Sequence, residues 1–299
     1  MRSEGQGEQN KAMTKQPAES ANAAQIEYWN HRIAHVWADR HEQIDRLFAE
    51  ITEFALGLAA PKPGECVLDI GCGAGTTTLL LAARVVPSGR VVGADLSRHS
   101  AARARERITT GGVGNAEVIV ADVGSHRFAS DSFDLAFSRF GVMFFPDPIA
   151  SLRNVRAAMR QGGRLTFAVF RPRQENPFAA LPYAAVAHLL PPLTPPGPEE
   201  PGQFSWADPA RVQRILQGAG FRDVSLTPHD PRLRMAEPGA AVQAAELALH
   251  LGPVSRAIAT MDAPPTEALR STLEAFFQQH DGPQGIVLPA ALWIVQARV

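Results

Sequence analysis

The sequence predicts an α/β domain in which a mostly parallel sheet carries helices on both faces. Short apolar runs that are typical of buried strands alternate with helix-forming segments, at the spacing of strand–helix–strand units. A glycine-rich turn, VLDIGCGAG (67–75), closes the first of these runs. With 299 residues, the chain is long enough for one such domain with an elaboration.

Five strands are expected in the first part of the chain. An amphipathic helix precedes them, because apolar residues recur at three- and four-residue steps between Ile44 and Leu58. Ser97 and the pair Asp147–Pro148 mark helix starts, since Ser and Asp cap a first turn and proline fits the first helical position. The expected strands are 66–70, 90–95, 116–122, 132–140 and 164–170.

The pattern changes after residue 170. Ten of the 24 prolines fall within 172–209, which indicates a stiff and irregular excursion. A helix restarts at Asp208–Pro209, and further elements complete a sheet of seven strands. They are a strand at 221–227, a helix at 265–279 and a strand at 286–299. The expected organisation is a disordered polar segment (1–24) and a domain (25–299) with cap insertions at 171–206 and about 231–262.

Composition excludes several classes of protein. A net charge of −1 gives no global basic field for nucleic acid, and the apolar runs are broken before they reach membrane-spanning length. Cys66 and Cys72 lie beside the same expected strand, a poor arrangement for a disulfide-stapled secreted fold. We therefore expect a cytoplasmic protein with reduced thiols. A homodimer is compatible with the sequence, which does not specify it.

The glycine turn has three interpretations. A phosphate-binding ATPase loop needs a lysine after its last glycine, and Thr76 stands there instead. A dinucleotide-binding loop needs G-x-G-x-x-G, but the third glycine, Gly75, arrives one residue early. The acid inside the strand, Asp69, suits a ligand with a positive charge. The acid and the three glycines remain to be explained together.

The pattern acid-x-G-x-G-x-G resembles motif I of the class I S-adenosylmethionine-dependent methyltransferases. Asp95 lies twenty residues after Gly75 at a strand end, and Asp122 follows the third strand, as that family requires. SFDLAFSRF, DPIASL and QGGRLTF then supply the fourth strand, the helix and the fifth strand. QIEYWN (25–30) and SRFGVMFF-x-DP (138–148) narrow the resemblance to the methyltransferase type 11 group, which includes the ubiquinone/menaquinone enzymes.

The resemblance implies a Rossmann-like seven-stranded sheet whose last strand runs antiparallel between the fifth and sixth. It implies S-adenosyl-L-methionine as cofactor and S-adenosyl-L-homocysteine as product. Asp95 would bind the ribose hydroxyls, Asp122 the adenine amino group, and Asp69 would lie near the amino group of the methionine moiety. The residues expected at the cofactor are Tyr28, Asp69, Gly71, Cys72, Gly73, Gly75, Asp95, Leu96, Ala121, Asp122, Val123 and Ser138.

Three residues are candidates for positioning the acceptor or for acting as a base: His31, His35 and Arg139. The two histidines are four residues apart, as metal ligands can be, but no third ligand is evident and no metal is expected. A surface or packing role is the alternative for both histidines, and an ion pair for Arg139. Cys72 is expected to fill space and not to act as a nucleophile.

The expected function is transfer of a methyl group to a small-molecule acceptor by in-line displacement. No acid–base or nucleophile constellation stands out, which favours a mechanism based on proximity. The main alternative is a non-catalytic regulatory or scaffold protein that binds the same cofactor. A nicotinamide oxidoreductase and a nucleic-acid methyltransferase are further alternatives, weakened by the glycine spacing and by the neutral charge. Specificity is expected from the N-terminal helix, the fourth strand's end and the 171–206 cap.

Overall fold

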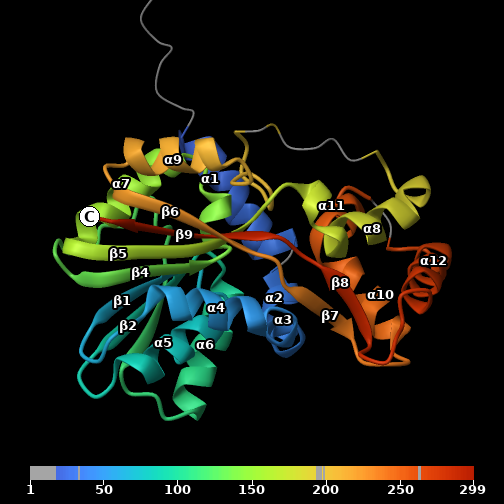
Figure 1. The fold of residues 1–299 in the computed structure, drawn as a ribbon, viewed down its shortest axis with the longest axis horizontal. Helices are drawn as coiled ribbons and strands as arrows, with labels where there is room; N and C mark the ends of the chain where they lie inside the picture. Colours follow the sequence, from blue (N-terminus) through green and yellow to red (C-terminus); the bar gives the residue numbers. More distant parts are fainter. Residues whose placement is uncertain (1–17, 33, 193–196, 198, 262–263) are drawn as a thin grey trace, which may run out of the picture.

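The computed structural model describes residues 18–32, 34–192, 197, 199–261 and 264–299. Its main sheet has seven strands in the order β3-β2-β1-β4-β5-β9-β6 (Figure 1). Strands β1 to β5 are parallel, and β9 pairs antiparallel with β5 and with β6. The strands are β1 Cys66–Ile70, β2 Arg90–Asp95, β3 Ala116–Val120, β4 Phe133–Arg139, β5 Met159–Phe170, β6 Arg222–His229 and β9 Leu292–Arg298. The predicted fold is confirmed, including the antiparallel strand.

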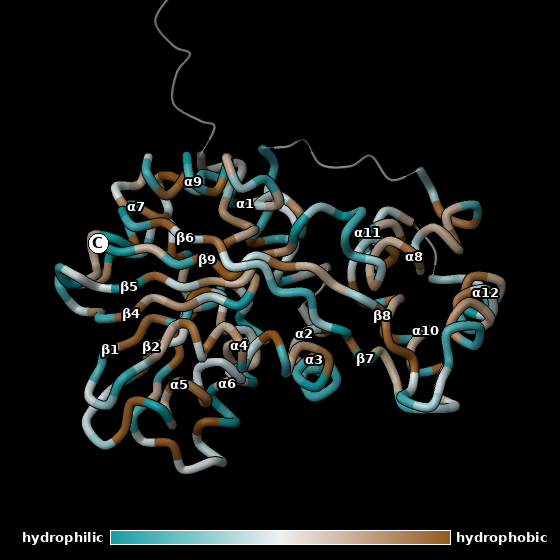
Figure 2. Tube along the Cα trace, in the orientation of Figure 1, coloured by the Kyte–Doolittle hydropathy of each residue, from teal (hydrophilic) through white to brown (hydrophobic). Residues whose placement is uncertain are grey.

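Helices cover both faces of this sheet. Figure 1 shows α7 and α9 on one face and α4, α5 and α6 on the other. The covering helices are α4 Ala49–Ala59, α5 Thr76–Val85, α6 Arg98–Thr110, α7 Pro148–Ala158 and α9 Pro209–Gly218. The central strands are strongly hydrophobic (Figure 2), because helices cover them on both sides.

The predicted helix starts are confirmed by side-chain caps. Ser97 Oγ accepts a hydrogen bond from the Ser100 amide at the start of α6, and Asp147 accepts one from the Ala150 amide at the start of α7. Asp208 caps α9 in the same way. Each cap satisfies a backbone donor that the first helical turn leaves unpaired.

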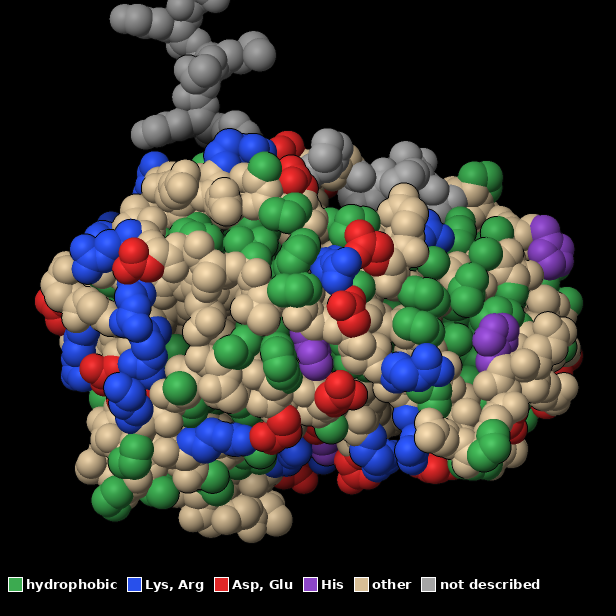
Figure 3. All heavy atoms as spheres, in the orientation of Figure 1, with side chains coloured by type: hydrophobic (Ala, Val, Ile, Leu, Met, Phe, Trp, Pro, Cys, Tyr) green, Lys and Arg blue, Asp and Glu red, His purple; other side chains and the backbone are tan. Residues whose placement is uncertain are grey.

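A smaller lobe stands beside the main sheet. Two antiparallel strands, β7 (Arg232–Ala236) and β8 (Ile286–Pro289), form its sheet. Its helices are α8 Pro177–Val186, α10 Ala241–His250, α11 Gly252–Ile258 and α12 Glu267–Gln278. Figure 3 shows apolar side chains over this lobe and basic ones gathered at the far edge of the molecule. The lobe includes α12 and β8, so its second segment extends beyond the expected 231–262.

The predicted single strand at 286–299 is wrong. It is two strands, β8 and β9, which belong to different sheets. At the break, the Ala290 amide donates to Pro231 O, and the Ala291 amide donates to the side chain of Asn176. These two hydrogen bonds fix the backbone where it passes from the small lobe to the main sheet. The sequence signal for this break is Pro289, the last residue of β8, because a proline cannot donate to the hydrogen-bond ladder of a continuous central strand.

The described N-terminal residues form a chain of short helices. They are α1 Ala18–Glu27, the π-helix η1 Tyr28–Arg32, α2 Ala34–Asp39 and α3 His41–Leu47. Residues 1–17 of the segment expected to be disordered lie outside the described residues, and α1 begins within the remainder. Single turns of 3₁₀ helix occur at η2 Gly141–Phe144, η3 Arg173–Glu175 and η4 Ala187–Leu189. Within the described residues, no helix is both long and apolar enough to cross a membrane.

Candidate functional site

The glycine loop between β1 and α5 is shaped by close backbone contacts. Gly71, Gly73 and Gly75 have φ angles of 67°, 55° and 87°, a region that side chains disfavour. A Cβ atom on Gly71 would lie 2.8 Å from the Gly141 Cα, and one on Gly75 would lie 2.9 Å from the Ala104 Cβ. A Cβ on Gly73 would meet nothing within 4 Å. The loop is therefore packed closely against the protein at Gly71 and Gly75, and space remains beside it at Gly73.

Asp69 lies beneath this loop and is completely buried. Its Oδ2 atom accepts hydrogen bonds from the Thr77 hydroxyl at 2.7 Å and the Thr78 hydroxyl at 2.6 Å. Burial raises the pKa of Asp69 to about 6, against the hydrogen bonds, which lower it. Its Oδ1 atom has no hydrogen-bond partner among the described residues. Asp69 thus joins β1 to the first turn of α5.

Asp95 connects the end of β2 to the glycine loop. Its Oδ2 accepts a hydrogen bond from the Gly73 amide at 2.7 Å, and its Oδ1 accepts one from the Ser97 amide at 2.8 Å. Burial raises the pKa of Asp95, against these two bonds. Each carboxylate oxygen keeps a further lone pair, so the group can accept hydrogen bonds from two neighbouring hydroxyls.

Asp122 follows β3 and is held by its own turn. Oδ1 accepts a hydrogen bond from the Gly124 amide at 2.9 Å, and Oδ2 accepts one from the Ser125 hydroxyl at 2.6 Å. The side-chain amide of Asn22, from α1, also donates to Oδ2. The N-terminal helix therefore reaches the loop after β3.

Asn30 fastens the N-terminal helices to the loop after β2. Its Nδ2 donates to Leu96 O at 3.0 Å, and its Oδ1 accepts a hydrogen bond from the Arg98 amide at 2.9 Å. Beside it, the Trp29 ring packs edge-on against Phe144, with ring centroids 4.9 Å apart. These contacts place the N-terminal helices as a roof over the carboxyl ends of the strands, where open α/β sheets bind ligands.

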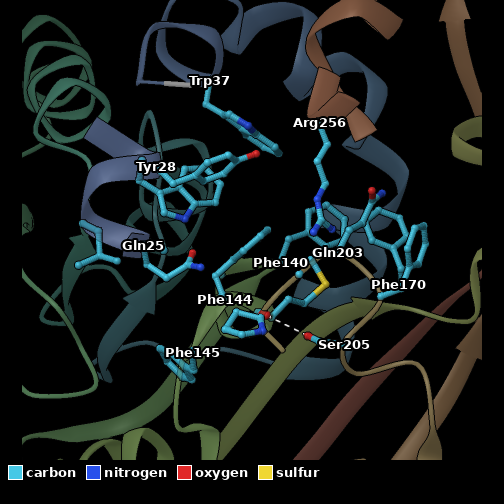
Figure 4. Close-up of a pocket in the computed structure, with 18 of the residues that line it drawn as sticks. Gln25, Tyr28, Trp37, Phe140, Phe144, Phe145, Phe170, Gln203, Ser205 and Arg256 are labelled. Carbon is cyan, nitrogen blue, oxygen red and sulfur yellow. Dashed lines mark hydrogen bonds between the residues drawn. The ribbon is translucent and has the colours of Figure 1, made fainter. Parts of the chain in front are cut away.

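A cavity of about 900 Å³ lies under this roof. The N-terminal helices, the loops after β1 to β5 and the small lobe all contribute to its walls. Its volume lies at the upper end of the ~300–1,000 Å³ that is usual for ligand sites. Figure 4 shows aromatic side chains converging from several elements. The aromatic residues that line it are Tyr28, Trp29, Trp37, Phe48, Phe140, Phe144, Phe145, Phe170, Phe178 and Phe204.

Arg139 lines the cavity from the end of β4 and is held from behind. Its guanidinium donates to the Thr52 hydroxyl at 2.9 Å and lies 3.4 Å from a carboxylate oxygen of Asp45. Burial lowers the pKa of Arg139, while Asp45 raises it. A guanidinium remains protonated in proteins, so Arg139 can position a ligand but cannot act as a base.

The predicted site residues divide into two sets. Most line the cavity, and the others lie behind the loop or outside what the structure describes. Those that line it are Tyr28, Gly71, Gly73, Asp95, Leu96, Ala121, Asp122, Val123 and Arg139. Those that do not are Asp69, Cys72, Gly75 and Ser138. For His31 and His35 the helical backbone is described, but their side chains lie outside the described part of the structure.

Two of the predicted cofactor residues face the protein interior. Cys72 is buried in a cluster with Ala101 and Ala104, and burial raises the pKa of its thiol. Ser138 Oγ donates to Ile70 O at 2.8 Å and accepts a hydrogen bond from the Gly141 amide at 3.1 Å. Both side chains stabilise the loop from behind and do not reach the cavity.

His250, at the end of α10, lines the cavity and has no counterpart in the sequence-based expectations. Its Nε2 atom lies 2.9 Å from Nη2 of Arg40. Arginine only donates, so Nε2 accepts this bond, and the neutral ring carries its proton on Nδ1. Burial and Arg40 both lower the pKa of His250, which favours the neutral form. No motif marks this histidine in the sequence.

The described residues contain no group of three or more His, Cys, Asp or Glu side chains arranged to hold a metal ion. Three features together define a protein that binds a nucleoside-containing ligand. They are the glycine loop, the acids Asp95 and Asp122 at the ends of neighbouring strands, and the roof of N-terminal helices. The residues at the cavity fit S-adenosylmethionine: Asp95 offers paired acceptors, Asp122 offers a further carboxylate after β3, and Gly73 leaves space beside the loop.

Comparison with known proteins identifies the family. Residues 67–163 match the family model described as a methyltransferase domain. The chain is 32% identical to aklanonic acid methyltransferase DauC of Streptomyces sp. strain C5, over 55% of this chain and 78% of that protein. It is 31% identical to nocamycin O-methyltransferase of Saccharothrix syringae, over 62% of this chain and 70% of that protein. It is 30% identical to demethylmenaquinone methyltransferase of Corynebacterium kroppenstedtii, over 60% of this chain and 77% of that protein.

Solved structures share the fold at lower identity. YcgJ of Bacillus subtilis superposes with a TM-score of 0.55 at 18% identity, over 82% of this chain and 98% of that one. Phosphoethanolamine N-methyltransferase 2 of Haemonchus contortus superposes with a TM-score of 0.51 at 18% sequence identity, over 83% of this chain and 52% of that one. The [4+2]-cyclase SpnF superposes with a TM-score of 0.50 at 17% sequence identity, over 83% of this chain and 80% of that one. The fold alone therefore does not fix the chemistry.

The chain belongs to the class I S-adenosylmethionine-dependent methyltransferases. It is a methyltransferase enzyme whose cofactor is S-adenosyl-L-methionine, and a demethylmenaquinone methyltransferase is among its relatives. The predicted family, cofactor and reaction class are confirmed, and no comparison supports the non-catalytic alternative.

Gly71→Ala is expected to destabilise the protein more than Gly112→Ala does. Both glycines have a left-handed φ, which costs alanine roughly 1–2 kcal/mol, but a Cβ on Gly112 meets nothing within 4 Å. At position 71 the Cβ also collides with the Gly141 backbone, which adds about 1–3 kcal/mol. Urea unfolding of both variants measures the difference. Equal destabilisation would show that the contact with Gly141 is not tight.

Asp69 is expected to make the free energy of unfolding depend on pH. Its folded pKa of about 6 exceeds the ordinary value of 3.8, so its stabilising contribution is full below pH 3.8 and is lost as the pH rises through 6. That pKa difference corresponds to about 3 kcal/mol. Urea unfolding between pH 4 and 8 should therefore show a falling difference between the wild type and Asp69→Asn. Parallel stability curves would contradict the assignment.

Proposed function

We propose that this methyltransferase transfers the methyl group of S-adenosylmethionine to a planar, largely apolar small molecule held in the aromatic part of the cavity. The observation that carries the proposal is a single cavity that joins the glycine loop to a chamber of aromatic side chains. Flat aromatic walls favour a flat ligand, since ring faces pack offset or edge to face. The relatives named for aklanonic acid, nocamycin and demethylmenaquinone support a small-molecule acceptor.

The cofactor is proposed to lie along the carboxyl ends of β1, β2 and β3. Asp95 would accept hydrogen bonds from the two ribose hydroxyls, and Asp122, which Asn22 contacts, would accept one from the adenine amino group. Gly71 and Gly73 would contact the amino-acid portion, with Tyr28 above it. Leu96, Ala121 and Val123 would pack on the adenine ring. Asp69, Cys72, Gly75 and Ser138 would act indirectly, by fixing the loop.

S-adenosylmethionine supplies a methyl group on a positively charged sulfur, and this charge disappears on transfer. The protein's task is to hold the acceptor in line and to keep water out. The N-terminal helices serve both purposes, since Asn30 fastens them to the loop after β2 and Trp29 packs on Phe144. An apolar chamber also favours a step in which charge is lost.

Two polar side chains could orient the acceptor. Arg139 stays protonated and would donate to an acceptor oxygen, with Asp45 and Thr52 fixing its direction. The neutral His250 would donate through its Nδ1 proton. We retain His31 and His35 as proposed bases or positioning residues, on their place in the N-terminal helices. The proposal holds for an oxygen, nitrogen, carbon or sulfur nucleophile.

The domain boundaries, the partners and the location are also proposals. We propose a catalytic domain over residues 25–299, with the small lobe as a cap over the acceptor. The net charge of −1 supports a small molecule and not a nucleic acid as partner. The free thiols of Cys66 and Cys72 support a reducing, cytoplasmic location.

Replacing Asp95 tests the proposed cofactor site. Asp95→Asn keeps the shape of the side chain but removes its charge and one acceptor oxygen. Loss of charge-assisted hydrogen bonds should weaken S-adenosylhomocysteine binding about 10- to 100-fold, measured by calorimetric titration. Asp131→Asn, the same change at an exposed acid, is the control and should bind as the wild type does. Unchanged affinity in Asp95→Asn would overturn the proposed site.

Turnover tests the acceptor class separately. A panel of planar hydroxyquinones, aromatic acids and phenols, incubated with S-adenosylmethionine, should yield a product one methyl group heavier by mass spectrometry. Cofactor binding without transfer to any planar acceptor, or transfer only to non-planar amines and thiols, would contradict the proposed acceptor class.

A further inference from the structure

Arg256 occupies the small-lobe side of the cavity. It comes from α11 and is half-buried, and its side chain reaches from that helix toward Phe140 and Gln203 (Figure 4). Arg256 therefore lines the same cavity as Phe140 and Phe170, which belong to the proposed acceptor chamber.

Arg256 differs from the other basic side chains that line the cavity. Arg139 is bound by Thr52 and Asp45, and His250 accepts a hydrogen bond from Arg40. Arg173 lies over the ring of Tyr183, 4.6 Å from its centroid. For Arg256, the described residues supply neither a hydrogen bond to its side chain nor an ion pair.

None of the described carboxylates that line the cavity forms an ion pair with Arg256. Asp95 and Asp122 accept backbone hydrogen bonds at the ends of β2 and β3. Glu27 and Glu200 are exposed to solvent, and Glu200 accepts a hydrogen bond from the Gly197 amide. Arg256 is thus a cation without a counter-charge among the described residues, in a cavity that aromatic side chains also line. A half-buried guanidinium that lines a cavity without a counter-charge is available to a ligand of opposite charge.

The chemistry of the missing partner follows from the guanidinium group. Its planar fork of N–H donors matches the two oxygens of a carboxylate, which it can bind with two parallel hydrogen bonds. An anionic acceptor also complements the positively charged sulfur of the cofactor. A cationic acceptor would be repelled by both groups.

We propose that Arg256 binds a carboxylate of the acceptor and so selects planar aromatic acids over neutral molecules of the same shape. This inference rests on the proposed function, because it assigns one end of the proposed acceptor chamber. It makes Arg256 a specificity-determining residue, whose removal should weaken acceptor binding and leave cofactor binding intact.

A matched pair of fluorescent probes tests the proposal. Anthracene-9-carboxylate and 9-anthracenemethanol share one ring system and differ in charge. Their affinities are measured by fluorescence titration of protein saturated with S-adenosylhomocysteine. Arg256→Met should weaken binding of the carboxylate about 10- to 100-fold and change binding of the alcohol by less than about twofold. Arg256→Lys should recover part of the loss, since it restores the charge without the planar fork.

The control is Arg232→Met, which removes an exposed arginine from β7, outside the cavity. It should bind both probes as the wild type does. Equal weakening of the two probes in Arg256→Met, or equal affinities of the wild type for both, would overturn the role of Arg256. S-adenosylhomocysteine affinity, measured for each variant, separates the two proposals. A wild type that does not bind it contradicts the proposed function, whereas intact binding without a carboxylate preference contradicts this inference alone.

Discussion

The hydrogen bonds of the Asp95 carboxylate are the interaction on which the site depends. One oxygen holds the Gly73 amide of the glycine loop, and the other holds the Ser97 amide at the start of α6. β1 and β2 are neighbouring parallel strands, so their carboxyl ends open at the same edge of the sheet. The carboxylate locks these two ends together. The remaining lone pairs of Asp95 then face the cavity from a fixed position.

The roof and the small lobe turn this edge of the sheet into an enclosed site. Asn22 reaches Asp122, and Asn30 reaches the loop after β2, so the N-terminal helices are fastened at both proposed ends of the nucleoside. The small lobe closes the other side with α10 and α11, which contribute His250 and Arg256. Enclosure by both parts suits a reaction that depends on alignment and exclusion of water.

The fold, and the loops that line the proposed cofactor end of the cavity, were predictable because their signals are local. Glycine spacing and an acid at each strand end report backbone geometry over a few residues. Which way a side chain faces is not local: Cys72 and Ser138 lie in the right segments but point into the protein, since Gly93, Ala104 and Ile70 surround them. His250 and Arg256 belong to small-lobe helices that bear no motif, and tertiary packing alone brings them to the cavity.

The most direct test of the central claim is a crystal structure of the protein with S-adenosylhomocysteine. The ribose should bind Asp95 through both hydroxyls, the adenine should lie between Leu96 and Asp122, and the sulfur should face the aromatic chamber. A ligand whose sulfur faces away from Phe140 and Phe170, or whose ribose does not contact Asp95, would contradict the account of one cavity built to join cofactor and acceptor.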